Sequence, residues 1–278
     1  MQTGEPSRTA LGAAVYRAHH QVADAGRIFR DPLAVPIVGT MPKLTDSFFD
    51  RDTHGRIRLL VAARSRFAED ALAEAVAAGT GQAVILGAGL DTFAYRNPHP
   101  RLRVFEIDHP DTQEWKRKRL READIAVPTS MTYVPVDFEH QTLDEAIAAT
   151  DFDPARPAFV IWLGVTVYLT RAAIGSTLRY LGGLAAGSQL VLDYAEPVIP
   201  STPEEHAAAE FRKQRLSQIN ERWLSFFTPP EMSTELHRHG FDVVEDLGPS
   251  ATAIRYAGAP ADTPERPGPH LLRAVVRG

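Results

Sequence analysis

The sequence predicts an α/β fold, in which a parallel sheet is covered by helices on both faces. Short apolar runs typical of buried strands alternate with helix-like stretches from Gln82 onward. Hydrophobic residues make up 44% of the 278 residues, which is enough for one large core. We expect an N-terminal helical cap over residues 1–80 and the sheet over 81–278, with a lid insertion around 200–228.

The predicted elements follow one another in a regular order. Two helix-like stretches come before the sheet, at 8–25 and 56–78, and the loop-rich residues 30–52 join them. The apolar runs beyond them predict strands at 84–86, 102–108, 131–136, 158–163, 189–194, 241–247 and 270–276.

Helices are expected between the strands, because several intervening stretches carry start signals. Thr142 and Glu145 have the spacing of a capping box, and Thr228 stands before two prolines. Helix-like stretches lie at 111–122, from 142, at 171–184 and from 228. Residues 203–222 are polar and helix-prone, and 257–269 are typical of a surface loop. These pieces are expected to cover the carboxyl ends of the strands, where such a sheet binds ligands.

The most informative motif is the turn Gly87-Ala88-Gly89 after the first predicted strand. One glycine lets the backbone turn tightly, and a second lets it approach a ligand without a Cβ in the way. The next strand ends at Asp108, about 20 residues later, as expected of an acid that binds ribose hydroxyls. A third strand runs into Asp137 and Phe138, an acid and a ring suited to adenine. Together the three units predict a site for a cofactor that contains adenosine.

The turn departs from the dinucleotide-binding pattern in two ways. Thr92 stands where a third glycine is required, and Asp91 would repel a pyrophosphate. Both departures favour a cofactor without phosphates, S-adenosylmethionine. A nicotinamide-dependent oxidoreductase on the same sheet stays open as an alternative, although the chain lacks a recognisable Tyr-x-x-x-Lys pair. A plain turn with helix-capping acids is the purely structural alternative.

Composition excludes several other classes of function. The net charge of −5 comes without a basic stripe, so no nucleic-acid partner is expected. The absence of cysteine excludes disulfides, thiolate metal sites and cysteine nucleophiles, and no metal is expected. No apolar run approaches the ~20 residues of a membrane span, and the first residues lack a signal core, so the expected location is cytoplasmic.

Beyond these motifs the chain resembles the leucine carboxyl methyltransferase family. Within this family, the chain resembles bacterial class I S-adenosylmethionine-dependent methyltransferases, which are often associated with the O-methylation of natural products. The segments that carry it are 27–34, 63–67, 86–92, 105–110, 136–138 and 162–169. The resemblance implies a Rossmann-like, seven-stranded class I methyltransferase sheet whose last strand is antiparallel, with S-adenosyl-L-methionine as cofactor.

The resemblance also implies a set of cofactor contacts. Arg64 would pair with the methionine carboxylate, since a guanidinium donates two parallel hydrogen bonds to such a group. His20 in the N-terminal helix would approach the same carboxylate, unless it is an ordinary partly exposed histidine. The expected contacts are His20, Arg64, Gly87, Ala88, Gly89, Asp108, His109, Asp137, Phe138 and Leu163.

One position departs from the family. Many relatives have Glu-Gly after the fourth strand, where this chain has Leu163-Gly164. The carboxylate that would meet the methionine ammonium is therefore absent, and backbone carbonyls around Gly87 or Leu163 would have to replace it. This loss keeps a non-catalytic, cofactor-binding relative open as an alternative.

The expected reaction is O-methylation of a small-molecule carboxylate or hydroxyl. Methyl transfer is an in-line displacement, so the protein mainly aligns and desolvates the acceptor. A carboxylate needs no base, whereas a hydroxyl does. The catalytic residue is unknown, and the candidates, each more readily explained as structural, are His19, His20, Tyr168, Tyr194 and Glu196.

The acceptor pocket is expected to be apolar. Trp223, Phe226 and Phe227 cluster ahead of the Thr228 helix start, where they would line this pocket or pack in the core. The expected partner is a small-molecule methyl acceptor rather than a protein tail, a nucleic acid or a membrane, and a homodimer is a candidate assembly.

Overall fold

The computed structural model describes residues 8–39, 51–137, 141–197, 199, 202, 206–207, 210 and 222–278. Its centre is a seven-stranded sheet with the strand order β3-β2-β1-β4-β5-β7-β6. The strands are β1 (Gln82–Leu86), β2 (Arg103–Asp108), β3 (Met131–Pro135), β4 (Phe159–Trp162), β5 (Gln189–Ala195), β6 (Phe241–Leu247) and β7 (Pro269–Val276).

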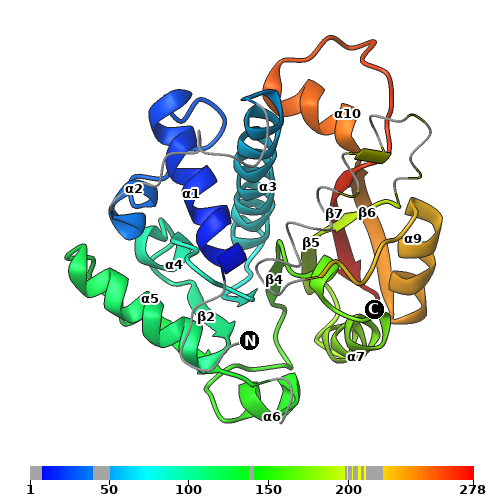
Figure 1. The fold of residues 1–278 in the computed structure, drawn as a ribbon. Helices are drawn as coiled ribbons and strands as arrows, with labels where there is room; N and C mark the ends of the chain where they lie inside the picture. The colour runs from blue at the N-terminus through cyan, green and yellow to red at the C-terminus, as the bar shows by residue number, and fades with distance from the viewer. Residues whose placement is uncertain are drawn as a thin grey trace.

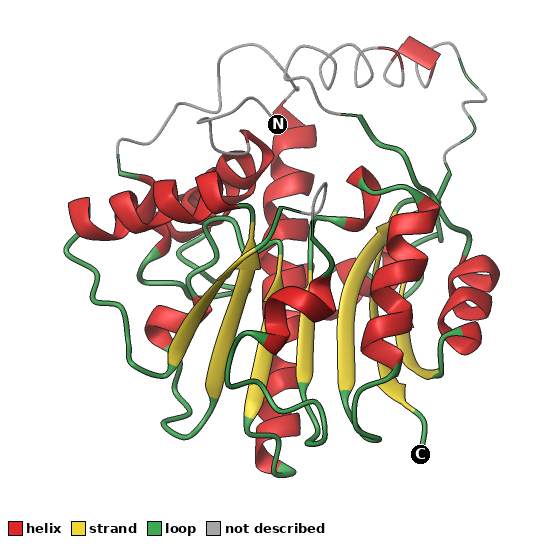
Figure 2. Cartoon of the chain, turned by 90° about the horizontal axis from the view of Figure 1, so that it is seen from below, coloured by secondary structure: helices red, strands yellow, loops and turns green. Residues whose placement is uncertain are grey.

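The first five strands are parallel, and β7 is antiparallel to both β5 and β6. The expected α/β sheet with an antiparallel last strand is therefore confirmed. Figure 2 shows the strands side by side. The chain ends just after β7, near the amino ends of β1–β5, because β7 is antiparallel to β5. Because β1 has β2 on one side and β4 on the other, the direction of strand order reverses at β1, which is where such sheets bind ligands.

Helices cover both faces of the sheet. Figure 1 shows α3 and α10 on one side, and α6 and α7 on the other. The helices are α1 (Arg8–Ala23), α2 (Ala34–Val38), α3 (Arg51–Ala77), α4 (Phe93–Arg96), α5 (Pro110–Glu122), α6 (Leu143–Ala148), η1 (Thr166–Tyr168), α7 (Arg171–Gly182), α9 (Pro229–Arg238), α10 (Pro249–Thr252) and η2 (Ala253–Ala257). Within the described part of the chain, none of them has the length and apolarity to cross a bilayer.

The start signals in the sequence act as predicted. The Thr142 and Thr228 side chains each accept from the third residue of their helices, and Glu145 and Glu231 reach back to the cap backbone. Each capping box satisfies backbone donors that the first helical turn would otherwise leave unpaired. Most of the expected helix-prone stretch 203–222 lies outside the described residues.

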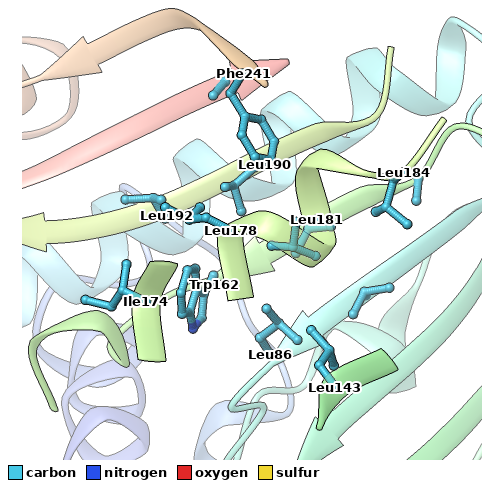
Figure 3. Close-up of a cluster of buried hydrophobic side chains, with 14 of the residues drawn as sticks. Leu86, Leu143, Trp162, Ile174, Leu178, Leu181, Leu184, Leu190, Leu192 and Phe241 are labelled. Carbon is cyan, nitrogen blue, oxygen red and sulfur yellow. The ribbon is translucent and has the colours of Figure 1, made fainter. Parts of the chain in front are cut away.

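The larger core lies between the sheet and α7, and Figure 3 shows it at close range. Ile174, Leu178 and Leu181 recur at intervals of three or four residues, so they share one face of α7 and pack with Trp162 and Leu192 from the sheet. Each is at most 2% exposed. Burying a side chain of this size contributes about 1.5–3 kcal/mol, so this layer holds β4 and β5 in place.

The second core involves α3, which belongs to the sheet's covering layer. Its Phe67 and Leu72 share a buried cluster with Ile85 of β1 and Val191 of β5. A third cluster joins α1 and α2 to Leu90, which follows the glycine turn, and to Leu120 of α5. The proposed domain boundary at residue 80 stays a prediction.

Candidate functional site

The glycine turn at the end of β1 requires glycine at both positions. Gly87 and Gly89 have φ of +63° and +47°, a region that side chains rarely adopt. A Cβ at Gly87 would lie 2.5 Å from Val165 Cγ2, and one at Gly89 would lie 2.9 Å from Ala10 Cβ. The turn is thus enclosed by α1 on one side and by the loop after β4 on the other.

Asp108 is fixed beside this turn at the end of β2. Its Oδ2 accepts a hydrogen bond from Gly89 N at 2.5 Å, and its Oδ1 accepts one from His109 N at 2.7 Å. Each carboxylate oxygen can accept two hydrogen bonds, so one lone pair on each remains for a ligand. Two adjacent acceptors of this kind suit the two neighbouring hydroxyls of a ribose. Burial raises the pKa of Asp108, and the two backbone donors oppose that shift.

Buried charges hold the strand that carries Asp108. Glu106 and Lys116 of α5 form an ion pair at 2.7 Å with both side chains 1% exposed, and Tyr95 donates to the same carboxylate at 3.1 Å. Burial raises the pKa of Glu106, and the nearby Lys116 ammonium opposes the shift. The pair joins α5 to β2, so Asp108 stands on a rigid strand.

The neighbouring predicted contacts lie at the same edge. His109 caps α5, because its Nδ1 accepts from Asp111 N at 3.2 Å. The half-buried Asp137 lies two residues after the end of the adjacent strand β3. It follows Val136, whose backbone N donates to Asp108 O at 2.9 Å. Phe138, predicted to cover adenine, lies outside the described residues.

Arg64 reaches the site from α3. Its Nη1 donates to Asp193 Oδ2 at 3.0 Å, and Asp193 Oδ1 accepts from Gly164 N at 2.6 Å. Leu163 follows β4 and packs against the core on the α3 side. A Cβ at Gly164 would lie 3.0 Å from Arg64 Nη2, so glycine there makes room for the guanidinium. Arg64 therefore lies at the carboxyl ends of β4 and β5.

His20 is placed differently from the prediction. It is completely buried, its Nδ1 lies 2.9 Å from Asp24 Oδ2, and its Nε2 accepts from the backbone N of Ile28 and of Phe29, both at 3.3 Å. With Nδ1 protonated towards Asp24, both ring nitrogens are engaged inside the cap. This histidine therefore closes the turn after α1, and the contacts leave it no nitrogen for a cofactor or for base catalysis.

Tyr194 is also structural. It is 2% exposed, donates to Asp246 Oδ2 at 2.6 Å and stacks on His270. Burial raises its pKa well above the ordinary 10, and the Asp246 carboxylate raises it further. A phenol held in this way keeps its proton, so these contacts favour a structural role for Tyr194, and its candidate catalytic role stays a prediction. Tyr168, at the end of η1, stays a candidate because it is half-buried beyond β4.

Sequence reasoning missed a buried ionic network under the cap. Asp31 is 1% exposed, and its carboxylate meets Arg17 Nε at 2.8 Å, Arg96 Nε at 3.3 Å and Thr92 Oγ1 at 2.7 Å. Arg17 also donates to the carbonyl of Leu90, directly after the glycine turn. Asp31 thus joins α1 to the segment that follows β1, and the Thr92 that replaces a third glycine serves this network.

It also missed Asp193. This acid lies within a predicted strand, one residue before its expected end, and Asp108 and Asp137 likewise lie at or next to strand ends. The rule that pointed to Asp108 and Asp137 could therefore have pointed to Asp193 as well.

The assembled groups fit an adenosyl amino acid. Asp108 offers two oriented lone pairs to a diol, and Arg64 offers a cation to a carboxylate. The glycine turn lies between them, at the strand where the order of the sheet reverses. Assignment of the individual cofactor contacts stays a prediction.

Comparisons with known proteins agree with this fold. Residues 10–182 match the family described as leucine carboxyl methyltransferase. The chain is 30% identical over 276 residues, 90% of each protein, to the "Putative S-adenosyl-L-methionine-dependent methyltransferase YktD" of Bacillus subtilis. A solved DUF574 family protein from Streptomyces avermitilis has a TM-score of 0.58 at 18% identity, covering 96% of this chain and 97% of that one. For the magnesium protoporphyrin IX methyltransferase of Synechocystis with bound SAH, the TM-score is 0.51 at 15% identity, covering 96% and 99%.

The fold and the family define an S-adenosylmethionine-dependent methyltransferase, and the cofactor predicted from the glycine turn is confirmed. The chain belongs to the leucine carboxyl methyltransferase family. Membership in this family removes the nicotinamide-dependent oxidoreductase from consideration.

Proposed function

We propose that the enzyme methylates an oxygen atom of a small-molecule carboxylate or hydroxyl, with the acceptor bound beside the loop after β4. The observation that carries the proposal is an aromatic segment held there by backbone hydrogen bonds. Leu224 N donates to Val167 O at 2.7 Å, and Phe227 N donates to Ala195 O at 3.0 Å. Residues 223–227 therefore run from η1 to the carboxyl end of β5.

Two aromatic rings of this segment supply an apolar wall. Trp223 and Phe226 are both half-buried, and their ring centroids lie 6.0 Å apart. Phe227, in contrast, is 2% exposed and belongs to the core, which is the second of its two predicted roles. An aromatic wall with a few polar groups is typical of pockets for small organic molecules. The mild net charge of −5 likewise favours a small acceptor over a nucleic acid.

The roles of the chain's own residues follow from the site. When bound, S-adenosylmethionine supplies a methyl carbon already activated by a positive sulfur. Asp108 holds the ribose, Arg64 holds the amino-acid end, and Trp223 with Phe226 keeps water away from the acceptor. The nitrogens of His20 and the hydroxyl of Tyr194 are engaged elsewhere, so a hydroxyl acceptor would need another base, such as Tyr168, whereas a carboxylate needs none.

The test uses the full chain, methyl-labelled S-adenosylmethionine and aromatic acceptors that share one ring but carry a carboxylate, a hydroxyl, an amine or a carboxamide. We expect label in a methyl ester, formed at a rate that is nearly flat from about pH 6 to 9. Transfer to the hydroxyl acceptor at a rate that rises with pH would instead show that the acceptor must first lose its proton. Transfer to the amine alone, or only to the carboxyl end of a protein, would contradict the proposal.

A matched pair of variants tests the wall itself. Trp223→Ala should raise KM for the acceptor about five- to thirtyfold, from the loss of roughly 1–2 kcal/mol of apolar contact. Leu224→Ala changes the neighbouring residue, which is 52% exposed, and should leave KM unchanged. Equal effects of the two substitutions on KM would show that the acceptor does not bind at this segment.

A further inference from the structure

Arg64 and Asp193 form a pair of opposite charges at the carboxyl ends of the strands. Arg64 Nη1 lies 3.0 Å from Asp193 Oδ2, and the two side chains are 17% and 14% exposed. The described contacts of Arg64 use Nη1, which leaves donors on its other nitrogens. Asp193 takes one hydrogen bond on each oxygen, from Arg64 and from Gly164 N, which leaves a lone pair on each. Both partners therefore retain bonding capacity for a ligand.

Such a pair is complementary to a zwitterion. An α-amino acid presents a carboxylate and an ammonium on one carbon, so a cation and an anion about 3 Å apart can each meet the opposite charge. Partial burial strengthens both interactions, because the effective dielectric is lower than in water. The methionine end of the cofactor is an amino-acid zwitterion of this kind.

We propose that Asp193 is the residue that binds the ammonium of the cofactor, while Arg64 binds its carboxylate. The side chain directly after β4 is the apolar Leu163, which cannot accept a hydrogen bond. The next strand supplies an acid instead, 2.6 Å from the backbone N of Gly164. The Asp193 carboxylate then takes the place of the backbone carbonyls that were predicted to bind the ammonium. The absence of a glutamate after β4 is then no argument for a non-catalytic protein.

A purely structural role for Asp193 has to be distinguished from this one. Its backbone O accepts from Thr166 Oγ1 at 2.6 Å, and its side chain accepts from Gly164 N. Asp193 therefore also shapes the loop from β4 to η1. A general loss of affinity after substitution would not separate the two roles, whereas a loss confined to one chemical group of the ligand would.

The experiment measures binding of three ligands to the full chain by calorimetry. They are S-adenosylhomocysteine, its analogue without the amino group and its analogue without the carboxylate. The unaltered chain should bind the first about ten- to a hundredfold more tightly than either analogue, the usual worth of a charged hydrogen bond. In Asp193→Asn the preference for the amino group should fall to about threefold or less while the preference for the carboxylate persists. Arg64→Gln should give the reverse pattern.

Controls keep the inference falsifiable. Asp193→Asn retains an oxygen for Gly164 N, and Asp193→Glu retains the charge and should restore part of the amino-group preference if the first variant folds poorly. Thr166→Val loosens the same loop without removing a charge, so its three affinities should keep the ratios of the unaltered chain. If Asp193→Asn lowers all three affinities by one factor, or keeps the full amino-group preference, the assignment is wrong. No acceptor is present, so this result is independent of the proposed O-methylation.

Discussion

We expect the substitution Asp31→Ala to loosen the packing of α1 on the glycine turn. Asp31 is 1% exposed and Arg17 is 6% exposed, so the substitution leaves a buried guanidinium without its counterion. Removing one partner of a buried ion pair costs about 3–5 kcal/mol. A domain has a free energy of unfolding of about 5–15 kcal/mol, so the variant should still fold near 25 °C but with a much smaller margin.

The structure also predicts a loss of cofactor affinity in the same variant. Arg17 donates to Leu90 O, and Ala10 of α1 closes on Gly89, so a displaced α1 no longer holds the turn that carries the site. Urea unfolding followed by circular dichroism gives the stability, and calorimetry with S-adenosylhomocysteine gives the affinity.

Thr92→Val is the matched control, because it removes one hydroxyl from the same carboxylate and no charge. Its expected cost is about 1–2 kcal/mol. If Asp31→Ala unfolds at the same urea concentration as Thr92→Val, the buried pair does not stabilise the cap. If its stability falls but its affinity for S-adenosylhomocysteine does not, the cap and the turn are not coupled.

Two further predictions concern single side chains. Asp108→Ala should weaken S-adenosylhomocysteine binding by about 1–3 kcal/mol, because the ribose hydroxyls lose their acceptors. If calorimetry finds an unchanged affinity, the ribose binds elsewhere. Tyr194→Phe should lower the free energy of unfolding by about 1–3 kcal/mol, because the hydrogen bond to Asp246 is lost, and turnover should stay within about twofold. A stable variant without turnover would instead support Tyr194 as the base.

The sheet could be predicted because its strands are short apolar runs that end in turn residues. The fourth strand, expected at 158–163, is observed at 159–162, and Asp108 ends β2 as expected. Such features are local, since a glycine turn or a capping box is formed by residues close together in the sequence. The antiparallel β7 was expected instead from the resemblance to the family, and the order of the strands was not predicted.

The contacts that the sequence did not predict join residues whose proximity cannot be inferred from their spacing in the chain. Nothing near His20 in the sequence shows that its ring turns inward to the backbone of Ile28 and Phe29. The ion pair of Arg64 and Asp193 joins residues 129 positions apart, and the bond of Asp31 to Thr92 joins residues 61 apart. These partners meet only after α3 and α1 have packed on the sheet.

The two backbone hydrogen bonds to Asp108 have a thermodynamic consequence. Gly89 N and His109 N hold the carboxylate in one orientation before any ligand arrives. Ordering a free side chain on binding costs about 0.5–1.5 kcal/mol, and here that ordering is completed during folding. Under the predicted assignment of Asp108, this orientation preorganises the enzyme for a ribose with both hydroxyls, and a deoxyribose analogue would leave one oriented acceptor without its donor.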